Sequence, residues 1–283
     1  MATTTAAAVN MIEEAKRRAA IKAVQEHFPK DPRFVGIGSG TTIVYVVEAI
    51  ASLGVDTSRI CFVPTGYQSR QLIINAGLVP IQFDSLPENT VIDIAFDGAD
   101  EVDDDLNCIK GGGACLFQEK LVAMRAKEFI CVADYRKLQP RLLTKWPTIP
   151  IEVAPLAARE VQSRLKALGS PKPVIREGNM AKAGPLKTDQ DFFIIDAPFP
   201  PLLTASDVAA GKDGSGRNGI WQVELLAQKI RGTHGVLEVG IFAGPTGPEA
   251  RAAGVIGGEK PVACYFGMED GSVTVRTAKP TVI

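Results

Sequence analysis

The sequence predicts an α/β protein with a parallel-sheet, Rossmann-like domain covered by helices on both faces and a smaller ferredoxin-like α+β domain. In the first half of the chain, short apolar runs alternate with helical segments, which is the pattern of a parallel sheet. The run 91–96 (VIDIAF) is almost continuously apolar, as in a strand that is buried on both faces. After Trp146–Pro150 the order of elements changes to β-α-β-β-α-β, the ferredoxin-like pattern.

The elements of the first domain follow one another along the chain. A short frayed tail at 1–10 precedes a helix over 11–28, in which apolar residues recur at helical spacing. Ligands of parallel sheets bind beyond the carboxyl ends of the strands, so the segments that follow strands are the candidates for a site. The expected strands are 34–38, 59–64, 79–83, 91–96 and 128–133, and the further helices are 43–53, 67–76 and 114–127.

The second domain is expected over 150–241, and the first is expected to comprise 1–149 and 242–283. The segment 196–218 lies between the last two expected strands of the second domain. It is rich in proline, glycine and aspartate and is predicted to be a surface loop. Short strands after residue 242 should return to the first domain. The elements expected are strands at 151–153, 173–176, 192–195, 236–241 and 261–266, and helices at 156–168 and 221–230.

Composition excludes several classes of protein. The formal net charge is −1, so no overall basic field favours nucleic acid or an anionic membrane. No apolar run approaches the roughly 18 residues that a membrane span needs. The five cysteines are odd in number and form no CxxC pair, which argues against structural zinc and a disulfide framework. We therefore expect a reducing compartment and a cytoplasmic location.

The first segment that suggests a site is Gly38-Ser39-Gly40-Thr41-Thr42, between an expected strand and an expected helix. Glycines allow backbone amides to point at an anion, and the helix adds its positive N-terminal end. The segment lacks the lysine of a Walker loop and the dinucleotide fingerprint, which favours a monophosphate. A tight turn capped by serine or threonine is the alternative.

The second segment is the acidic run from Asp97 to Asp105, directly after the buried strand. Its spacing does not match an EF-hand loop, and a solvated acidic loop is its usual meaning. Asp97 and Asp100 would nevertheless face the site and could hold sugar hydroxyls. We expect the last three aspartates, Asp103 to Asp105, to be merely solvated.

The third segment is Lys110-Gly111-Gly112-Gly113, followed by a helix that carries Glu119. Before a helix, a run of glycines can present amides to a negative oxygen, and Lys110 adds charge. Glu119 lies on an otherwise apolar helix face, where partial desolvation would strengthen it as a base. The alternative is a glutamate at the edge of that face, paired with Lys120 or Arg125.

The remaining chemistry is that of carboxylates and lysines around a small anion. The chain has two histidines, His27 and His234, and neither lies beside the three segments. Nucleophilic chemistry of the Ser/His or Cys/His kind therefore fits poorly.

Four motifs in register then identify a resemblance. GIGSGTT, FDGADEVD, KGGGACLFQEK and VADYRKL occur in the order and spacing of the A-type ribose-5-phosphate isomerases, and VPTGYQSRQLI resembles eukaryotic, fungal members. The resemblance covers nearly the whole chain, including the small domain. The segment 114–118, between the glycines and Glu119, differs in detail from the family's usual sequence. The loop 196–218 is longer than in the compact members of the family.

The resemblance implies an aldose–ketose isomerase of the pentose phosphate pathway that works on a sugar phosphate, with no cofactor and no metal, as a homodimer or homotetramer. It implies that Glu119 is the catalytic base and that Asp97 and Asp100 contact sugar hydroxyls. Lys110 would stabilise the negative oxygen of the intermediate. The implied substrate-binding residues are Lys16, Ser39, Gly40, Thr41, Thr42, Gly98, Ala99, Gly111, Gly112, Gly113 and Lys137.

Two other classes compete with this interpretation. A sugar-phosphate deaminase or lactonase would use histidine in its site, and the two histidines of this chain do not lie beside the three segments. A sugar-phosphate sensor would need a DNA-binding module, and no basic helix-turn-helix segment precedes residue 34.

Overall fold

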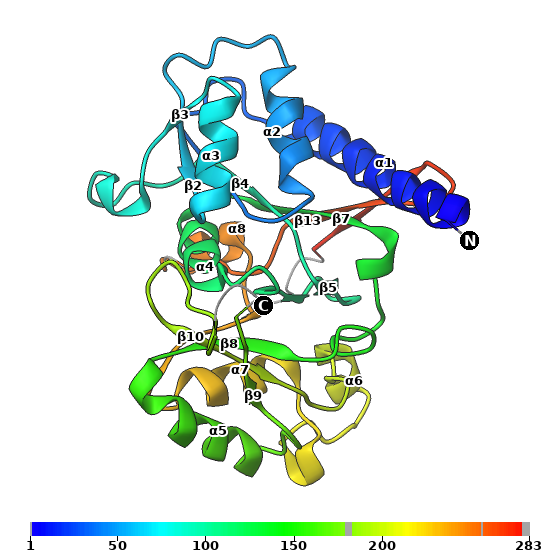
Figure 1. Cartoon of the computed structure of the whole chain (residues 1–283), viewed down its shortest axis with the longest axis vertical. Coiled ribbons are helices and arrows are strands. Elements are labelled where there is room, and N and C mark those ends of the chain that lie inside the picture. Colours follow the sequence, from blue (N-terminus) through cyan, green and yellow to red (C-terminus); the bar gives the residue numbers. More distant parts are fainter. Residues whose placement is uncertain (1, 179–182, 256, 279–283) are drawn as a thin grey trace. The chain divides into compact units, whose positions relative to one another are not determined.

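The computed structural model describes residues 2–178, 183–255 and 257–278 (Figure 1). Packing divides the chain into a first unit and a second unit. The expected boundaries place 100–117 and 139–149 with the first domain, whereas packing groups both segments with the second unit. The first unit is Met1–Ala99, Gln118–Leu138 and Pro245–Ile283, and the second is Asp100–Phe117 and Gln139–Gly244.

The first unit is built on a seven-stranded sheet in the order β14-β13-β7-β4-β1-β2-β3. All neighbouring strands are parallel except β13 and β14, which form an antiparallel edge. The predicted parallel sheet is therefore confirmed, and the C-terminal segment returns to it as expected. The strands are β1 (Phe34–Ile37), β2 (Cys61–Pro64), β3 (Val79–Pro80), β4 (Ile94–Asp97), β7 (Phe129–Asp134), β13 (Ala263–Gly267) and β14 (Val273–Thr277).

The helices expected over 11–28, 43–53, 67–76 and 114–127 are found with shifted ends, whereas the short helices at 135–137 and 247–252 were not expected. The segment expected to be a frayed tail is helical from Ala2, because it is rich in alanine, the residue with the highest helix propensity. The short helix η1 (Phe83–Ser85) follows β3, where the sequence suggests a longer strand. The helices are α1 (Ala2–His27), α2 (Ile43–Ala51), α3 (Tyr67–Asn75), α4 (Leu116–Arg125), η2 (Tyr135–Lys137) and α8 (Gly247–Ala252).

The alternating direction of the side chains along β1 shows how the sheet is covered on both faces. Val35 and Ile37 are buried in one apolar cluster with residues of α1 and α2. Gly36 points the other way, where a Cβ atom would lie 2.5 Å from the Val122 side chain of α4. The missing side chain of Gly36 thus lets α4 pack closely on the sheet.

The second unit contains the predicted ferredoxin-like arrangement. Its four strands are antiparallel and run in the order β11-β8-β10-β9, with one helix after the first strand and one before the last. The segment expected to be a surface loop contains a short helix, α6, which begins with a capping box of Thr204 and Asp207. The elements are β8 (Ile149–Val153), η3 (Pro155–Ala157), α5 (Ala158–Ala167), β9 (Val174–Ile175), β10 (Phe193–Ala197), α6 (Ala205–Ala209), η4 (Arg217–Gly219), α7 (Val223–Arg231) and β11 (Val236–Val239).

A three-stranded sheet, β12-β6-β5, completes the second unit. The expected strand over 236–241 is split at Gly240, after which the chain joins this other sheet. A Cβ atom on Gly240 would lie 2.2 Å from the Lys110 carbonyl oxygen, so only glycine fits at the crossing point. The strands are β5 (Glu101–Val102), β6 (Cys108–Ile109) and β12 (Ile241–Phe242).

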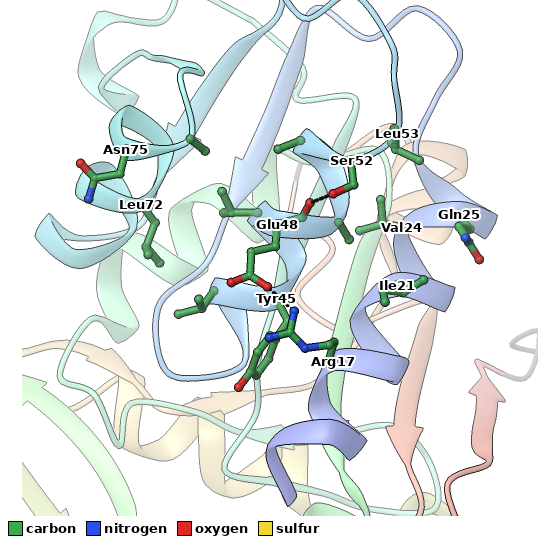
Figure 2. A pocket seen from close by; sticks show the side chains of 15 residues that line it. Arg17, Ile21, Val24, Gln25, Tyr45, Glu48, Ser52, Leu53, Leu72 and Asn75 are labelled. Carbon is green, nitrogen blue, oxygen red and sulfur yellow. Dashed lines mark hydrogen bonds and ion pairs between the residues drawn. The ribbon is translucent and has the colours of Figure 1, made fainter. Parts of the chain in front are cut away.

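Helices α1, α2 and α3 of the first unit also line a largely apolar pocket of about 670 Å³ (Figure 2). Arg17 and Glu48 form an ion pair at its wall. The residues implied by the family resemblance are not among those that line it. Within the described part of the chain, no helix has the length and hydropathy that crossing a membrane requires.

Candidate active site

The loop between β1 and α2 is held by hydrogen bonds from other parts of the first unit. The Ser39 amide donates to Asp97 Oδ1 at 3.2 Å, and the Gly40 amide donates to Gln68 Oε1 at 2.8 Å. Gly40 has φ +106°, a conformation that favours glycine, and the space beside its Cα is open. The loop therefore has a set shape with an uncrowded surface at the N-terminal end of α2, as an anion site requires.

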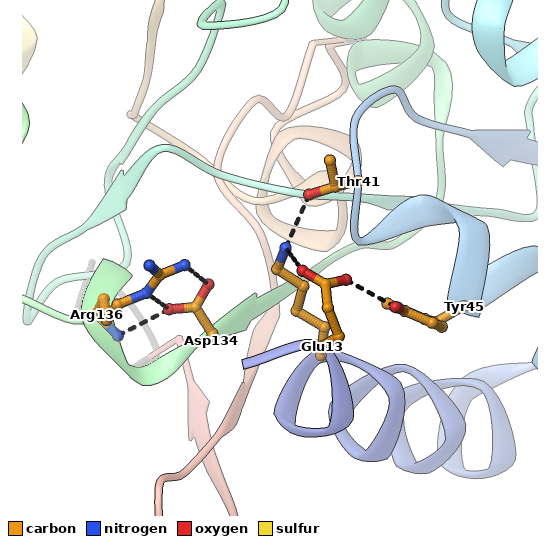
Figure 3. A network of polar contacts seen from close by, with 6 residues as sticks. Glu13, Thr41, Tyr45, Asp134 and Arg136 are labelled. Carbon is orange, nitrogen blue, oxygen red and sulfur yellow. Dashed lines mark hydrogen bonds and ion pairs between the residues drawn. The ribbon is translucent and has the colours of Figure 1, made fainter. Parts of the chain in front are cut away.

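Lys16 of α1 is directed at this loop. Its side chain is only 9% exposed, and Nζ donates to Thr41 Oγ1 at 2.9 Å. The same ammonium lies 2.8 Å from Glu13 Oε1 (Figure 3). A buried ammonium next to a threonine hydroxyl and a helix N-terminus favours a phosphate dianion, because all three attract negative charge.

Glu13 and Tyr45 are partners of this lysine that sequence reasoning missed. The Tyr45 hydroxyl donates to Glu13 Oε2 at 2.7 Å (Figure 3). Burial raises the pKa of Glu13, but hydrogen bonds from Lys16 and Tyr45 outweigh it and hold that pKa below its ordinary value. The bond to Glu13 in turn raises the pKa of Tyr45 to about 12. The spacing of Glu13 and Lys16, three residues apart on one helix, was the available signal.

Asp97 is the last residue of β4 and is 3% exposed. Its Oδ1 accepts the amides of Gly98 at 2.7 Å and of Ser39 at 3.2 Å. A Cβ atom on Gly38 would lie 2.0 Å from that same oxygen, so the carboxylate reaches the loop only because residue 38 is glycine. Gly98 and Ala99 follow and are partly exposed. Asp97 thus joins the end of β4 to the loop after β1.

Lys137 lies in the short helix η2, after β7, and is partly exposed. Its neighbour Arg136 donates from Nε and Nη2 to the Asp134 carboxylate, at 2.6 and 3.0 Å (Figure 3). Burial raises the pKa of Asp134, but the bonds from Arg136 and the charge of Lys137 hold it below its ordinary value. This end of β7 therefore carries a cation beside an ionised carboxylate.

Glu119 lies in the first turn of α4, which begins at Leu116 rather than at the expected residue 114. The side chain is buried, with 6% of its surface exposed. Of the two basic residues in the alternative pairing, Lys120 lies 3.4 Å from Glu259, and Arg125 donates to the Thr90 carbonyl. A buried carboxylate is less well hydrated than a surface one and is a stronger base for that reason.

Asp100 and Lys110 belong to the second unit. Asp100 Oδ2 accepts the Gly112 amide at 2.7 Å, and a Cβ atom on Gly112 would lie 2.7 Å from the carboxylate. Lys110 is 3% exposed, and its Nζ is 5.4 Å from the centre of the Phe242 ring. A buried ammonium is a strong electrostatic partner for a negative oxygen.

The glycine loop offers fewer amides than its sequence suggests. The Lys110 amide donates to the Gly240 carbonyl at 2.8 Å, and the Ala114 amide donates to the Gly111 carbonyl at 3.0 Å. The Gly112 amide donates to Asp100. In the part of the chain that the structure describes, the Gly111 and Gly113 amides take part in none of these bonds.

The acidic run does not behave as expected throughout. Asp104 is exposed and Asp105 is partly exposed, but Asp103 is fully buried, so the prediction that it is merely solvated is wrong. Asp103 accepts the amides of Asp105 and Asn107 and the Asn107 side chain, and so closes the turn between β5 and β6. Burial raises the pKa of Asp103 to about 7 despite these bonds.

Fold and site together define an α/β protein with a glycine-containing loop at the N-terminal end of α2, a buried lysine beside it and buried carboxylates. The profile of the family described as ribose 5-phosphate isomerase A (phosphoriboisomerase A) matches residues 61–252. The chain is 47% identical to a ribose-5-phosphate isomerase of Mycosarcoma maydis, covering 96% of this chain and 84% of that protein. It is 44% identical to the enzyme of Candida albicans, covering 93% and 96% respectively.

A solved structure agrees with these relatives. A D-ribose-5-phosphate isomerase in complex with phospho-erythronic acid superimposes with a TM-score of 0.75 at 32% identity, covering 94% of this chain and 99% of that one. The chain belongs to the ribose-5-phosphate isomerase A family. The resemblance seen in the four motifs is thereby confirmed, as is the class of enzyme, an isomerase.

Proposed function

We propose that this protein interconverts ribose 5-phosphate and ribulose 5-phosphate by proton transfer through an enediolate, with Glu119 as the base. The observation that carries the proposal is a buried glutamate, 6% exposed, in the first turn of α4. The family and its named relatives support the substrate. The relative that binds phospho-erythronic acid holds a phosphorylated sugar acid of related chemistry.

The phosphate group is assigned to the loop Ser39–Thr42 together with Lys16. The contact between Lys16 and Thr41 supports this assignment, because it joins an ammonium and a hydroxyl at the N-terminal end of α2. Lys137 adds a further positive charge after β7. Binding energy from the phosphate would be used to hold the sugar in the reactive position.

The chemistry needs a base, a stabiliser for a negative oxygen, and groups that handle hydroxyl protons. Glu119 removes the proton from C2 and returns it to C1. Lys110 and the Gly111–Gly113 loop stabilise the charge on the enediolate oxygen, and donors of this kind are each worth about 3–4 kcal/mol. Asp97 and Asp100 contact the sugar hydroxyls and assist ring opening. Every step uses side chains and amides of this chain.

Replacing Glu119 with glutamine tests the proposal. Glutamine keeps the size and hydrogen-bonding reach of the side chain but cannot accept the proton, so kcat should fall by roughly 10²–10⁴. Exchange of the substrate C2 hydrogen with solvent deuterium should fall with it, because both need the same base. Inhibition by inorganic phosphate should change little, since the phosphate contacts involve other residues.

The matched control is Glu128→Gln, the same change at a partly exposed glutamate that pairs with His27. This variant should keep wild-type turnover. A Glu119→Gln enzyme that still exchanges the C2 hydrogen at nearly the wild-type rate would move the base to Asp97 or Asp100. A wild-type protein without activity on ribose 5-phosphate would overturn the function itself.

We further propose a cytoplasmic enzyme that acts as a homodimer or homotetramer, with no metal or cofactor. None of the five cysteines forms a disulfide and three of them are buried, which suits a reducing compartment. The domain expected over 150–241 would serve assembly more than chemistry, since it contains none of the three site segments. Light scattering of the intact protein at micromolar concentration measures the assembly, and a monomer would contradict it.

A further inference from the structure

One arginine of the second unit binds two carbonyls of the glycine loop. Arg176 follows β9, and its Nη1 donates to the Gly111 carbonyl at 3.0 Å and to the Gly112 carbonyl at 3.1 Å. The family motifs do not contain this residue, which lies more than sixty positions further along the chain. A guanidinium that binds two successive carbonyls restrains both peptide planes at once.

The guanidinium is itself held by a carboxylate. Arg176 Nε donates to Asp196 Oδ2 at 2.8 Å, and Nη2 donates to Asp196 Oδ1 at 2.6 Å. Asp196 lies on β10 and is paired with Val174 of β9, the antiparallel neighbouring strand, and Arg176 directly follows that strand. The side chains are 17% and 25% exposed. This two-pronged pairing sets the plane of the guanidinium and the direction of its remaining donor.

The opposite side of the loop is also fixed. Asp100 accepts the Gly112 amide at 2.7 Å. Because a peptide unit is planar, the carbonyl of one residue and the amide of the next point in opposite directions. The bond from Arg176 to the Gly111 carbonyl therefore helps to aim the Gly112 amide at Asp100. Its bond to the Gly112 carbonyl aims the Gly113 amide away from the guanidinium.

A loop of three glycines needs this restraint. Glycine populates more backbone conformations than any other residue, and Gly111 adopts φ +104°. An oxyanion donor contributes most when it is already in place before the charge develops. A free loop would have to lose its conformational entropy during the reaction, whereas a clamped loop has lost it on folding.

We propose that Arg176, held by Asp196, is a positioning residue that presets the Gly111–Gly113 loop for the enediolate oxygen. The inference rests on the proposed function of that loop. The pair has no net charge, so its contribution comes from geometry rather than from a long-range field. Lysine at position 176 keeps the charge. Its single ammonium cannot donate two hydrogen bonds to the Asp196 carboxylate and also bind both loop carbonyls.

The test compares Arg176→Met, Arg176→Lys and Asp196→Asn with the wild type. For both arginine variants, kcat on ribose 5-phosphate should fall about 10- to 100-fold, somewhat less than the loss of a whole oxyanion donor. KM should stay within about threefold, and inorganic phosphate should inhibit equally well. Affinity for phospho-erythronic acid should fall in proportion to kcat/KM, because its carboxylate takes the place of the enediolate oxygens. Asp196→Asn should show a smaller loss in the same direction.

The control is Arg141→Met in the same unit. Arg141 binds Asp207 with the same two-pronged geometry, at 2.6 and 2.6 Å, so its guanidinium is engaged away from the glycine loop. Its loss should lower the melting temperature comparably and leave kcat unchanged. Circular dichroism and thermal melts establish that each variant is folded. Arg176→Ala, tested with added guanidinium at a non-denaturing concentration, should regain part of its turnover if the variant is folded.

Three outcomes would overturn the inference. An Arg176→Lys enzyme with wild-type kcat would show that charge alone suffices. An Arg176→Met enzyme that is folded and fully active would show that Arg176 has no role in catalysis. A fall in apparent kcat that matches the unfolded fraction, with unchanged affinity of the folded enzyme for phospho-erythronic acid, would make the residue merely structural. In each case a wild-type enzyme that is active and a Glu119→Gln variant that is inactive would leave the proposed function intact.

Discussion

Replacing Gly38 with alanine should damage both stability and phosphate binding, because of what an added Cβ atom would meet. It would lie 2.0 Å from Asp97 Oδ1 and 2.7 Å from Asp97 Cβ, far inside ordinary van der Waals contact. Asp97 is buried, so its carboxylate cannot move into solvent without leaving the loop. The substitution should therefore separate Asp97 from the Ser39 amide.

The size of the effect follows from one broken hydrogen bond and one steric clash. Hydrogen bonds to a charged group are worth about 1.5–3 kcal/mol each, and overpacking of a tight site costs about 1–3 kcal/mol. With the Ser39 bond broken and the site overpacked, we expect Gly38→Ala to lower the free energy of unfolding by about 3–5 kcal/mol. KM for ribose 5-phosphate should rise at least about tenfold, because the bond from the Ser39 amide no longer fixes the loop that we propose binds phosphate.

Urea unfolding and steady-state kinetics measure both effects. Gly54→Ala is the control, because Gly54 has φ +70° with nothing within 4 Å of a Cβ atom. That variant should lose only the conformational cost, about 1–2 kcal/mol, with unchanged KM. In an Asp97→Ala background, Gly38→Ala should cost less, since most of the clashing atoms are gone. A Gly38→Ala enzyme within about 1 kcal/mol of the control and with wild-type KM would refute this reasoning.

The other predictions concern phosphate binding, pH and metals. Thr41→Val should raise KM for ribose 5-phosphate about tenfold at similar kcat, by removing a hydrogen bond beside Lys16; an unchanged KM would contradict the loop assignment. Glu152 is fully buried on β8, and burial raises its pKa to about 7. The ionised form therefore opposes folding as pH rises from about 4.5 to 7, by roughly 3 kcal/mol. Glu152→Gln should be increasingly more stable than wild type from about pH 5 to pH 8; a constant difference in melting temperature would argue against this. Activity should survive excess chelator, whereas complete loss restored by one divalent ion would contradict a site of carboxylates and lysine.

Local sequence patterns were sufficient to predict most of the fold. Apolar periodicity located the strands and helices of the parallel sheet, and the order of elements after residue 150 predicted the antiparallel arrangement that the second unit adopts. Both features depend on residues close together in the chain, which is why the sequence reveals them. The split of the last strand at Gly240 could not be read locally, because its cause is the approach of the Lys110 and Pro150 carbonyls.

The candidate site shows the same division. Glycine loops, the aspartate after a buried strand and the glutamate on an apolar helix face are visible as residue types in local context. Their partners are not, because Asp97 binds the Ser39 amide 58 positions away and Arg176 binds the Gly111 carbonyl 65 positions away. Asp103 belongs with these cases, since its burial depends on how the chain folds around the turn between β5 and β6.

The sequence by itself determined the fold class, the chemical types of the site residues and the family. Tertiary structure decided which carboxylates are buried, which glycine amides remain available and which side chains hold the loops in shape. The physical reason is that propensity and periodicity act over a few residues, whereas hydrogen bonds and desolvation depend on neighbours brought together by folding.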